Sequence, residues 1–348
     1  MFSTCQDPSE IASLQFQAPT GRRAPSNPPP TPPLLTLQSW ADMTEPAAAP
    51  ARPLAGEDPL VSIVTPCRNA ARFLEETIQS VLSQDYPCID YLVMDGGSTD
   101  DTLDLLRRYG DRLRYESRPD GGQADAINRG FRLARGRIFA YLNADDTYLP
   151  GAIRTAVGHL LANPGIGVVY GEAYYVNREG QILRRYPTAP FHPQLLNSRC
   201  YICQPAAFLR AEVFESVGLM NPELHFALDY DLWMRVARRY PMLKVDEFLA
   251  TSRMHLENKT LGQRRLAYRE VLRVIYTHYK YIPFDPVYGY CCHLVDKKDQ
   301  FFEHSPPTLL KYGLSLLLGS WYNRRQPVRY WRECALATTA ALKRFSNR

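Results

Sequence analysis

The sequence lacks a hydrophobic run long enough to cross a lipid bilayer. The most apolar segment of its C-terminal part, Thr308–Tyr322, has fifteen residues and is interrupted by Lys311, whereas a membrane-spanning helix needs about 20 apolar residues. The N-terminus also lacks the basic stretch followed by an apolar one that marks a secretory signal. From these two absences we expect a cytoplasmic protein without a membrane span.

Cysteine is present, but not in the arrangement that a zinc site needs. The eight cysteines are scattered, and the pair Cys200 and Cys203 is matched only by the adjacent Cys291 and Cys292, which lack the spacing of zinc ligands. Thiols in a cytosolic protein are normally reduced. We therefore expect reduced thiols and no structural zinc ion.

Acidic residues are almost absent from the C-terminal segment 306–348. This segment has eight lysines and arginines and one acidic residue, Glu333, although the net charge of the whole chain is only +5. No recognised nucleic-acid-binding motif accompanies the basic charge, so we expect no nucleic acid as a partner. An anionic lipid surface is the better candidate.

The same segment combines aromatic residues with its arginines. Beside its arginines the sequence has four large aromatic residues, which are Trp321, Tyr322, Tyr330 and Trp331. This composition is typical of a helical pair that lies in a membrane interface, and it predicts peripheral contact with the inner face of the cell membrane. The alternative is a C-terminal helix that packs on the main domain.

Residues 1–58 are rich in proline and alanine. Eleven of the 28 prolines fall there, and five of them lie in the run 28–33. Proline donates no backbone hydrogen bond, and a segment of this composition buries little apolar surface. We therefore expect a disordered leader.

From Leu60 onward, short apolar segments typical of strands alternate with segments of helical spacing. The expected strands are 60–65, 91–94, 113–116, 138–142 and 168–170, and the expected helices are 73–82, 101–109, 125–134 and 150–161. This alternation predicts an α/β domain with a doubly wound, mostly parallel sheet and helices on both faces. A hairpin follows around 177–180, and the chain is largely helical from about Leu261. We divide it into the leader 1–58, a domain 59–256 and a helical C-terminal region 257–348.

Polar residues follow two of the expected strands. Asp95 ends the strand 91–94, and Asn143, Asp145 and Asp146 follow the strand 138–142. Ligands of a doubly wound sheet bind at the carboxyl ends of its strands, and carboxylates hold Mg²⁺ or Mn²⁺. We predict that Asp145 binds the metal, while Asp146 is a second ligand or a support for the loop. An Asx-rich turn before Pro150 is the structural alternative.

The loop after the first expected strand, 65–69, can hold a nucleobase or a phosphate. Its Arg68 could stack on the base or pair with the phosphate. Asp95 could accept hydrogen bonds from a uracil imide or a ribose hydroxyl, and the glycines after it permit close approach. Ser98, Thr99 and Asp100 are explained well enough as a helix cap.

Asp229 is the candidate general base. The neighbouring Asp231 pairs with Arg235 one helical turn later, which is a sufficient structural reason for that residue. Asp229 has no such reason and can take a proton from a hydroxyl. His255 could reach a diphosphate or its metal, although a lone histidine is more often structural.

Five segments together resemble the family 2 glycosyltransferases, which have the nucleotide-sugar-binding GT-A fold. They occur in the order of the family, and they are 61–66, 94–100, 120–130, 141–146 and 228–233. The resemblance covers about residues 60–256. It implies a bacterial enzyme of polysaccharide synthesis that uses Mn²⁺ or Mg²⁺.

The resemblance also implies roles for single residues. Asp95 would hold the nucleobase, Asn143, Asp145 and Asp146 stand at the metal-binding Asp-x-Asp motif, and Asp229 stands at the catalytic base. The remaining expected contacts to the nucleotide sugar are Pro66, Arg68, Asn69, Gln123, Asp125 and Gln204, and His255 would join the metal.

The chain departs from the family pattern at three positions. Asn143 replaces the first aspartate of the motif, Leu228 replaces the glutamate before the base, and Arg68 stands where an aromatic residue often stacks. An arginine can stack by its guanidinium plane. Asp145 and Asp146 still preserve two carboxylates.

We therefore expect an inverting transfer of a sugar, with uridine favoured as the nucleoside, to an acceptor hydroxyl. The acceptor could be a lipid-linked saccharide in surface polysaccharide synthesis. Two alternatives stay open, a nucleotidyltransferase of similar fold and a non-catalytic membrane-docked scaffold. The first usually has a Gly-rich basic loop, which 65–69 is not. The second is disfavoured because all three acids, Asp145, Asp146 and Asp229, are present.

Overall fold

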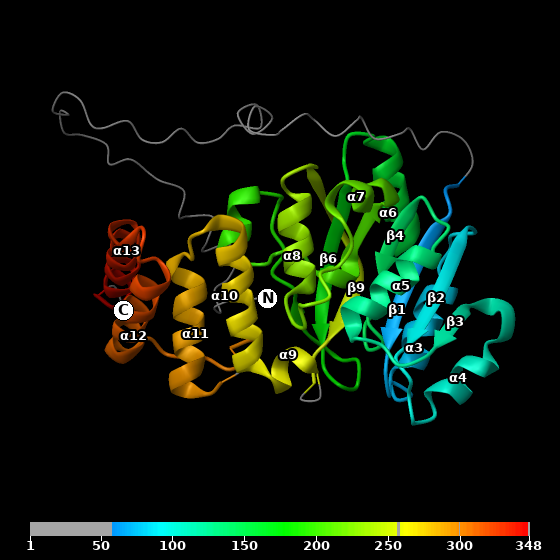
Figure 1. Ribbon diagram of the computed structural model, residues 1–348, viewed down its shortest axis with the longest axis horizontal. Helices are drawn as coiled ribbons and strands as arrows, with labels where there is room; N and C mark the ends of the chain where they lie inside the picture. The colour runs from blue at the N-terminus through cyan, green and yellow to red at the C-terminus, as the bar shows by residue number, and fades with distance from the viewer. Residues whose placement is uncertain (1–57, 256–257, 299, 347–348) are drawn as a thin grey trace.

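A nine-stranded sheet lies at the centre of the computed structural model, which describes residues 58–255, 258–298 and 300–346 (Figure 1). Along the sheet the strands follow the order β3-β2-β1-β4-β8-β6-β9-β5, and β7 pairs with β6. The expected leader lies outside the described residues except for Asp58.

The first part of the sheet is parallel. Its strands are β1 (Val61–Cys67), β2 (Ile89–Asp95), β3 (Arg114–Ser117) and β4 (Ile138–Tyr141), joined by the helices α3 (Leu74–Leu82), α4 (Thr102–Arg108) and α5 (Gln123–Leu133) with the short 3-10 helix η2 (Gly110–Arg112). Because the ladders are parallel, the carboxyl ends of these strands meet at one edge. That edge is where the expected site residues were placed.

The two faces of the sheet bury different apolar clusters. Along β1, Val61 and Ile63 face the cluster that contains α3, α4 and α6 (Ala152–Ala162). Val64 faces the cluster that contains α5, α7 (Ala211–Val217) and α8 (Leu228–Val236). Alternate residues of a strand point to opposite faces, so a mostly apolar run such as 61–64, interrupted only by Ser62, predicts burial on both sides. The doubly wound arrangement with helices on both faces is confirmed.

The second part of the sheet is mixed. Its elements are β5 (Thr147–Tyr148), α6 (Ala152–Ala162), β6 (Val168–Val176), β7 (Ile182–Arg185), η3 (Pro193–Asn197), η4 (Gln204–Ala206), β8 (Ala207–Arg210), α7 (Ala211–Val217), α8 (Leu228–Val236) and β9 (Met242–Arg253). β8 is antiparallel to β4 and β6, while β9 is parallel to β6. The expected parallel pairing therefore holds among the first four strands and between β6 and β9, whereas β5, β7 and β8 pair antiparallel.

Two strand expectations change in this part. The expected strand 168–170 and the first arm of the expected hairpin form the single strand β6. β9 was not expected, and it pairs with nearly the whole length of β6. The expected hairpin is confirmed by the antiparallel pairing of β7 with β6.

The C-terminal region is helical, as expected, and its helices continue away from the sheet beyond α8 (Figure 1). They are α9 (Lys259–Gly262), α10 (Arg264–Tyr279), α11 (Phe284–Asp296), α12 (Leu309–Tyr322) and α13 (Pro327–Ser346). Side chains of α10 and α11 share an apolar cluster with α8. The boundary at 256/257 stays a prediction, because the two parts share this core.

Lys311 explains the break in the apolar run of α12. Its side chain is fully buried, and Nζ donates to Asp296 Oδ2 at 2.6 Å and to Ser305 Oγ at 3.0 Å. A buried ammonium is tolerated when it is paired in this way. Among the described residues, no helix combines the length and the apolar character that a membrane crossing requires.

The described cysteines are free thiols in both apolar clusters. Six of the seven are buried, and Cys88 is half-buried. Burial raises the pKa of Cys67, Cys200, Cys203, Cys291, Cys292 and Cys334. These thiols are therefore protonated and inert in the folded chain.

Candidate active site

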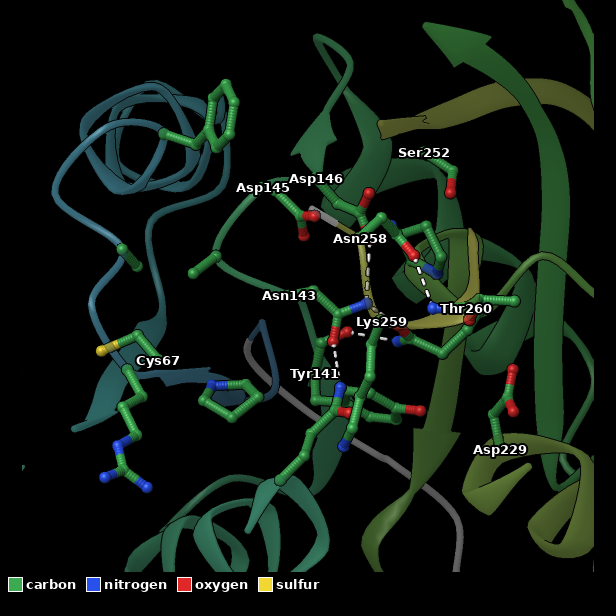
Figure 2. A pocket seen from close by; sticks show the side chains of 18 of the residues that line it. Cys67, Tyr141, Asn143, Asp145, Asp146, Asp229, Ser252, Asn258, Lys259 and Thr260 are labelled. Atoms are coloured by element: carbon green, nitrogen blue, oxygen red, sulfur yellow. Dashed lines mark hydrogen bonds between the residues drawn. The ribbon is translucent and has the colours of Figure 1, made fainter. Parts of the chain in front are cut away.

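A cavity of about 600 Å³ lies at the carboxyl edge of β1 and β4 (Figure 2). Its walls come from the loops after β1 and β4, the first turns of α5 and α8, and the residues that follow β9. Ten of the expected site residues line it, namely Pro66, Arg68, Asn69, Gln123, Asn143, Asp145, Asp146, Gln204, Asp229 and His255. The fold thus gathers segments that are up to 190 residues apart in the sequence.

Asn143 connects three of these segments. Its Oδ1 accepts a hydrogen bond from Gln123 Nε2 at 2.7 Å, and its Nδ2 donates to Asp146 Oδ2 at 3.0 Å and Gln204 Oε1 at 3.2 Å. Gln204 Nε2 in turn donates to the carbonyl of Tyr141 at 2.6 Å. An aspartate at position 143 could not donate to Asp146 and Gln204, so the amide suits these contacts.

Asp146 has structural partners on both oxygens. Besides the bond from Asn143, its Oδ1 accepts from Arg253 N at 2.8 Å, and its backbone carbonyl accepts from Thr77 Oγ1 at 2.8 Å. Burial raises the pKa of Asp146, and the adjacent Asp145 raises it further. These contacts give Asp146 a role in holding the loop against β9. Its role as a metal ligand stays a prediction.

Asp145 and His255 lie side by side in the lining of the cavity. His255 Nε2 lies 3.2 Å from Asp145 Oδ2, and the His255 ring packs against Phe73 at a centroid distance of 5.0 Å. A carboxylate and an imidazole are common ligands of Mn²⁺ and other divalent ions. In the part of the chain that the structure describes, no three His, Cys, Asp or Glu side chains gather as a metal site. The pair therefore fits a metal only if further ligands come from water or a diphosphate.

Asp95 does not line the cavity. It is fully buried, and its carboxylate accepts hydrogen bonds from Gly97 N, Ser98 N and Oγ, and Ser117 Oγ. Burial raises the pKa of Asp95, but the hydrogen bonds from Ser117 and Ser98 outweigh it and hold the pKa below its usual value. The contacts favour a role in shaping the loop after β2, and the nucleobase contact stays a prediction.

The loop after β2 is joined to the loop after β1 by hydrogen bonds. Asn69, at a positive φ of 49°, donates from its backbone to Ser98 Oγ and accepts from Thr99 N at 2.8 Å. Asparagine tolerates this left-handed conformation better than most residues.

Asp125, like Asp95, lies outside the cavity lining, where it accepts a hydrogen bond from Gly121 N at 3.2 Å.

Asp229 lies in the first turn of α8 and is buried in the cavity wall. Figure 2 shows it on the opposite side of Asn143 and Lys259 from Asp145. Its Oδ1 accepts from Tyr230 N at 2.8 Å, and burial raises its pKa. A carboxylate with a raised pKa binds protons more strongly, which suits a general base. The expected pair of Asp231 with Arg235 is confirmed at 2.8 Å.

The cavity lining also includes residues that the sequence did not predict, among them Ser252, Asn258, Lys259 and Thr260. Asn258 is the N-cap of α9, because its Oδ1 accepts from Thr260 N at 3.0 Å. An asparagine directly before a helical segment is an N-cap signal that could have indicated this turn. Burial lowers the pKa of Lys259, and its ammonium brings a positive charge to the same space as the acids.

Residues 62–218 match the sequence profile described as Glycosyl transferase family 2. The chain belongs to glycosyltransferase family 2. The matched range includes the loops after β1 and β4 and ends before α8. Within this glycosyltransferase, Asp229 and His255 therefore lie outside the matched range.

Two relatives of this glycosyltransferase match it over only about a third of their own length. An uncharacterized glycosyltransferase of Rickettsia felis is 32% identical over 212 residues, which are 57% of this chain and 35% of the relative. The chondroitin synthase of Escherichia coli is 25% identical over 206 residues, 58% of this chain and 30% of the synthase. This glycosyltransferase thus spans about a third of the length of these relatives.

A solved structure confirms the fold. The crystal structure of S. aureus TarS 1-349 in complex with UDP-GlcNAc superimposes on this glycosyltransferase with a TM-score of 0.53 and 15% sequence identity. The match covers 76% of this chain and 80% of that one. The superposition over most of both chains confirms the expected GT-A fold.

Proposed function

We propose that this family 2 glycosyltransferase moves a sugar from a nucleotide diphosphate sugar to an acceptor hydroxyl with inversion of the anomeric centre. One observation carries the proposal. Asp229 and the pair of Asp145 and His255 line the same cavity from different segments of the chain. A base and a site for a diphosphate therefore face one space large enough for both substrates.

Asp229 would act on the acceptor. Its carboxylate takes the hydroxyl proton while the acceptor oxygen attacks the anomeric carbon and the bond to the diphosphate breaks. One displacement inverts the configuration and needs no nucleophilic side chain. Burial raises the pKa of Asp229, so this carboxylate accepts a proton more readily than a solvated one.

Asp145 and His255 would hold Mn²⁺ or Mg²⁺. The ion would supply positive charge to the departing diphosphate. Asn143 and Asp146 fix the loop that carries Asp145, and Arg253 Nε donates to the Asp145 carbonyl at 2.9 Å. These contacts support a rigid placement of the Asp145 carboxylate.

A uridine diphosphate sugar is the proposed donor. The fold neighbour TarS was solved with UDP-GlcNAc, and relatives include chondroitin and hyaluronan synthases by name. In this chain Arg68, Asn69 and Gln123 line the part of the cavity beside the loop after β1, where they would contact the nucleotide.

The donor proposal is tested by thermal stabilisation with a panel of nucleotides and nucleotide sugars, with and without Mn²⁺. A ligand that binds only the folded state at 100 times its Kd adds about 2.7 kcal/mol. We expect one uridine diphosphate sugar to raise Tm with Mn²⁺ present, and Asp145→Ala to abolish the Mn²⁺-dependent part. Asp104→Ala on exposed α4 is the control. No shift with any nucleotide sugar would contradict the proposal.

We further propose a saccharide acceptor carried by a lipid, with the C-terminal helices on an anionic membrane. One face of α12 and α13 exposes large apolar side chains, which are Leu309, Leu310, Leu316, Leu317, Trp321, Val328, Trp331 and Leu336. Trp331 Nε1 donates to Ser320 Oγ at 2.8 Å, which joins the two helices within this face. The flanking Arg324, Arg325 and Arg332 are exposed. This combination fits an anionic lipid interface.

Flotation with vesicles tests the membrane contact. We expect the chain to float with vesicles that contain phosphatidylglycerol or phosphatidylserine, less with neutral vesicles, and less again at high salt because salt screens the arginines. The double variant L317E/W321E should stay in solution, whereas Ile182→Glu, at an exposed apolar position on β7, should float. Concentration-dependent dimers without vesicle binding would instead identify a second copy of the chain as the occupant of this face.

A further inference from the structure

The first turn of α8 has no cap of its own. Its N-cap residue, Ala227, has no side chain that could accept a hydrogen bond. The amides at the start of a helix need acceptors from elsewhere. This matters here because the same turn carries Asp229.

Glu270 of α10 supplies an acceptor for the amide of the N-cap residue Ala227 and for the two amides before it. Its Oε1 accepts from the backbone amides of His225 at 3.0 Å, Phe226 at 2.6 Å and Ala227 at 2.8 Å, and its Oε2 accepts from His225 at 3.0 Å. One carboxylate thus binds three consecutive amides directly before α8. It also places negative charge at the positive end of the helix dipole.

The segment that Glu270 holds is a wall of the cavity. His225, Phe226, Leu228 and Asp229 all line it. α10 also contacts α8 farther along, where His278 Nε2 lies 2.7 Å from Asp231 Oδ1. Helix α10 therefore fixes α8 on either side of Asp229 in the sequence.

We propose that Glu270 is a positioning residue, which holds the 225–227 turn so that α8 presents the Asp229 carboxylate to the cavity at the right place and angle. The proposal rests on Asp229 as the base of the proposed transfer. It assigns part of the catalytic arrangement to α10, outside the range 62–218 that matches the family profile. Misplacement of a reacting group by 1 Å can cost about 100-fold in rate.

The charge of Glu270 also acts on Asp229. Burial is the main cause of the raised pKa of Asp229, and the Glu270 carboxylate raises it further. Five titratable groups around Asp229 are neutral, because burial raises the pKa of Tyr141, Tyr186, Cys200, Cys203 and Tyr230. His225 lines the same cavity, and the charge of Asp231 is paired with Arg235 and His278. Lys259 supplies a cation to the cavity that Asp229 lines, and its Nζ lies 5.8 Å from the centroid of the Phe226 ring. Removing the Glu270 charge should therefore move the acidic limb of the activity profile to lower pH.

Two variants separate the hydrogen bonds from the charge. Glu270→Gln keeps an oxygen that can accept the three amides bound by Oε1, but it removes the charge. Glu270→Ala removes both. We expect E270A to lower kcat about 100-fold, the cost of misplacing the base, with KM for the donor nearly unchanged. E270Q should keep most of the maximal kcat and shift its acidic limb to lower pH.

The control makes the same chemical change on a neighbouring carboxylate. Glu223 pairs with Arg273 of α10 at 3.6 Å on the surface and does not bind the 225–227 turn. E223Q should leave kcat and the pH profile unchanged. Circular dichroism gives the folded fraction, by which each kcat is divided. If E270A does not fold, Glu270→Asp, one methylene too short to reach the turn, provides the same comparison.

A double-mutant cycle with Asp229→Asn decides between outcomes. If Glu270 acts through Asp229, adding E270A to D229N should lower turnover little beyond D229N alone. Wild-type kcat per folded molecule in E270A and E270D, beside an inactive D229N, would overturn the positioning role and leave the proposed function intact. Undiminished turnover in D229N would instead refute Asp229 as the base.

Discussion

Asp95 at the end of β2 and Asp229 at the start of α8 are both buried carboxylates near one edge of the sheet, yet their surroundings have opposite effects. Donors from Ser98 and Ser117 hold the pKa of Asp95 low, whereas burial raises the pKa of Asp229. A carboxylate with enough donors stabilises its loop as an anion. A buried carboxylate with few donors destabilises the fold as an anion and remains basic.

The largest expected effect is on turnover, and it distinguishes Asp229 from Asp95. Asp229→Asn should lower kcat by about 10²–10⁴-fold, the usual contribution of a general base, because the amide cannot take the proton from the hydroxyl of the acceptor substrate. Turnover of the donor by the purified variant is the measurement. Asp95→Asn is the contrasting variant. Loss of the predicted nucleobase contact should raise KM for the donor, while kcat per folded molecule should fall far less than in D229N. Equal losses in both would erase the difference between the two carboxylates.

A smaller effect separates them by stability. Asp95→Ala leaves the amides of Gly97 and Ser98 and the hydroxyl of Ser117 without their acceptor, which should lower the free energy of unfolding by about 1–3 kcal/mol. Urea titration followed by circular dichroism measures it. Because the folded pKa of Asp95 is low, its contribution is present at neutral pH and is lost as the pH falls through that value. Asp104→Ala, an exposed change, should be neutral.

The smallest effect has the opposite sign. A folded pKa above the unfolded one means that the ionised Asp229 destabilises the folded state at neutral pH. Asp229→Asn should therefore raise Tm at pH 7 while it abolishes turnover, and the gain should shrink as the pH falls and the wild-type carboxylate becomes protonated. Scanning calorimetry at several pH values is the test. A lower Tm in D229N at pH 7 would show that the carboxylate is stabilised by partners.

The fold followed from the sequence where the pattern was local. The alternating runs at 60–65, 91–94 and 138–142 predicted the parallel part of the sheet and its ligand-binding edge, and β1, β2 and β4 confirm them. β9 was missed because its buried positions are irregularly spaced and two register shifts occur opposite β6. Such a strand has no simple period of two.

The site followed from the sequence only in part, because spacing predicts proximity but not partners. Asp95 and Asp146 were chosen for their place after strands, yet their donors, Ser117 and Arg253, come from other segments. Glu270 gave no sequence signal at all. A glutamate in the middle of an amphipathic helix looks like any solvated residue until the neighbouring turn is known.

The alkylation rates of the buried thiols measure local opening of the folded chain. Cys203 lies in the cluster beneath α3 and α6, whereas Cys291 lies in the cluster shared with the C-terminal helices. A thiol reacts as the thiolate and only when a reagent can reach it, so alkylation at each position follows the local opening of its own surroundings. Mass spectrometry of timed alkylation would then time the loosening of the C-terminal helices and of the sheet separately, without any introduced label.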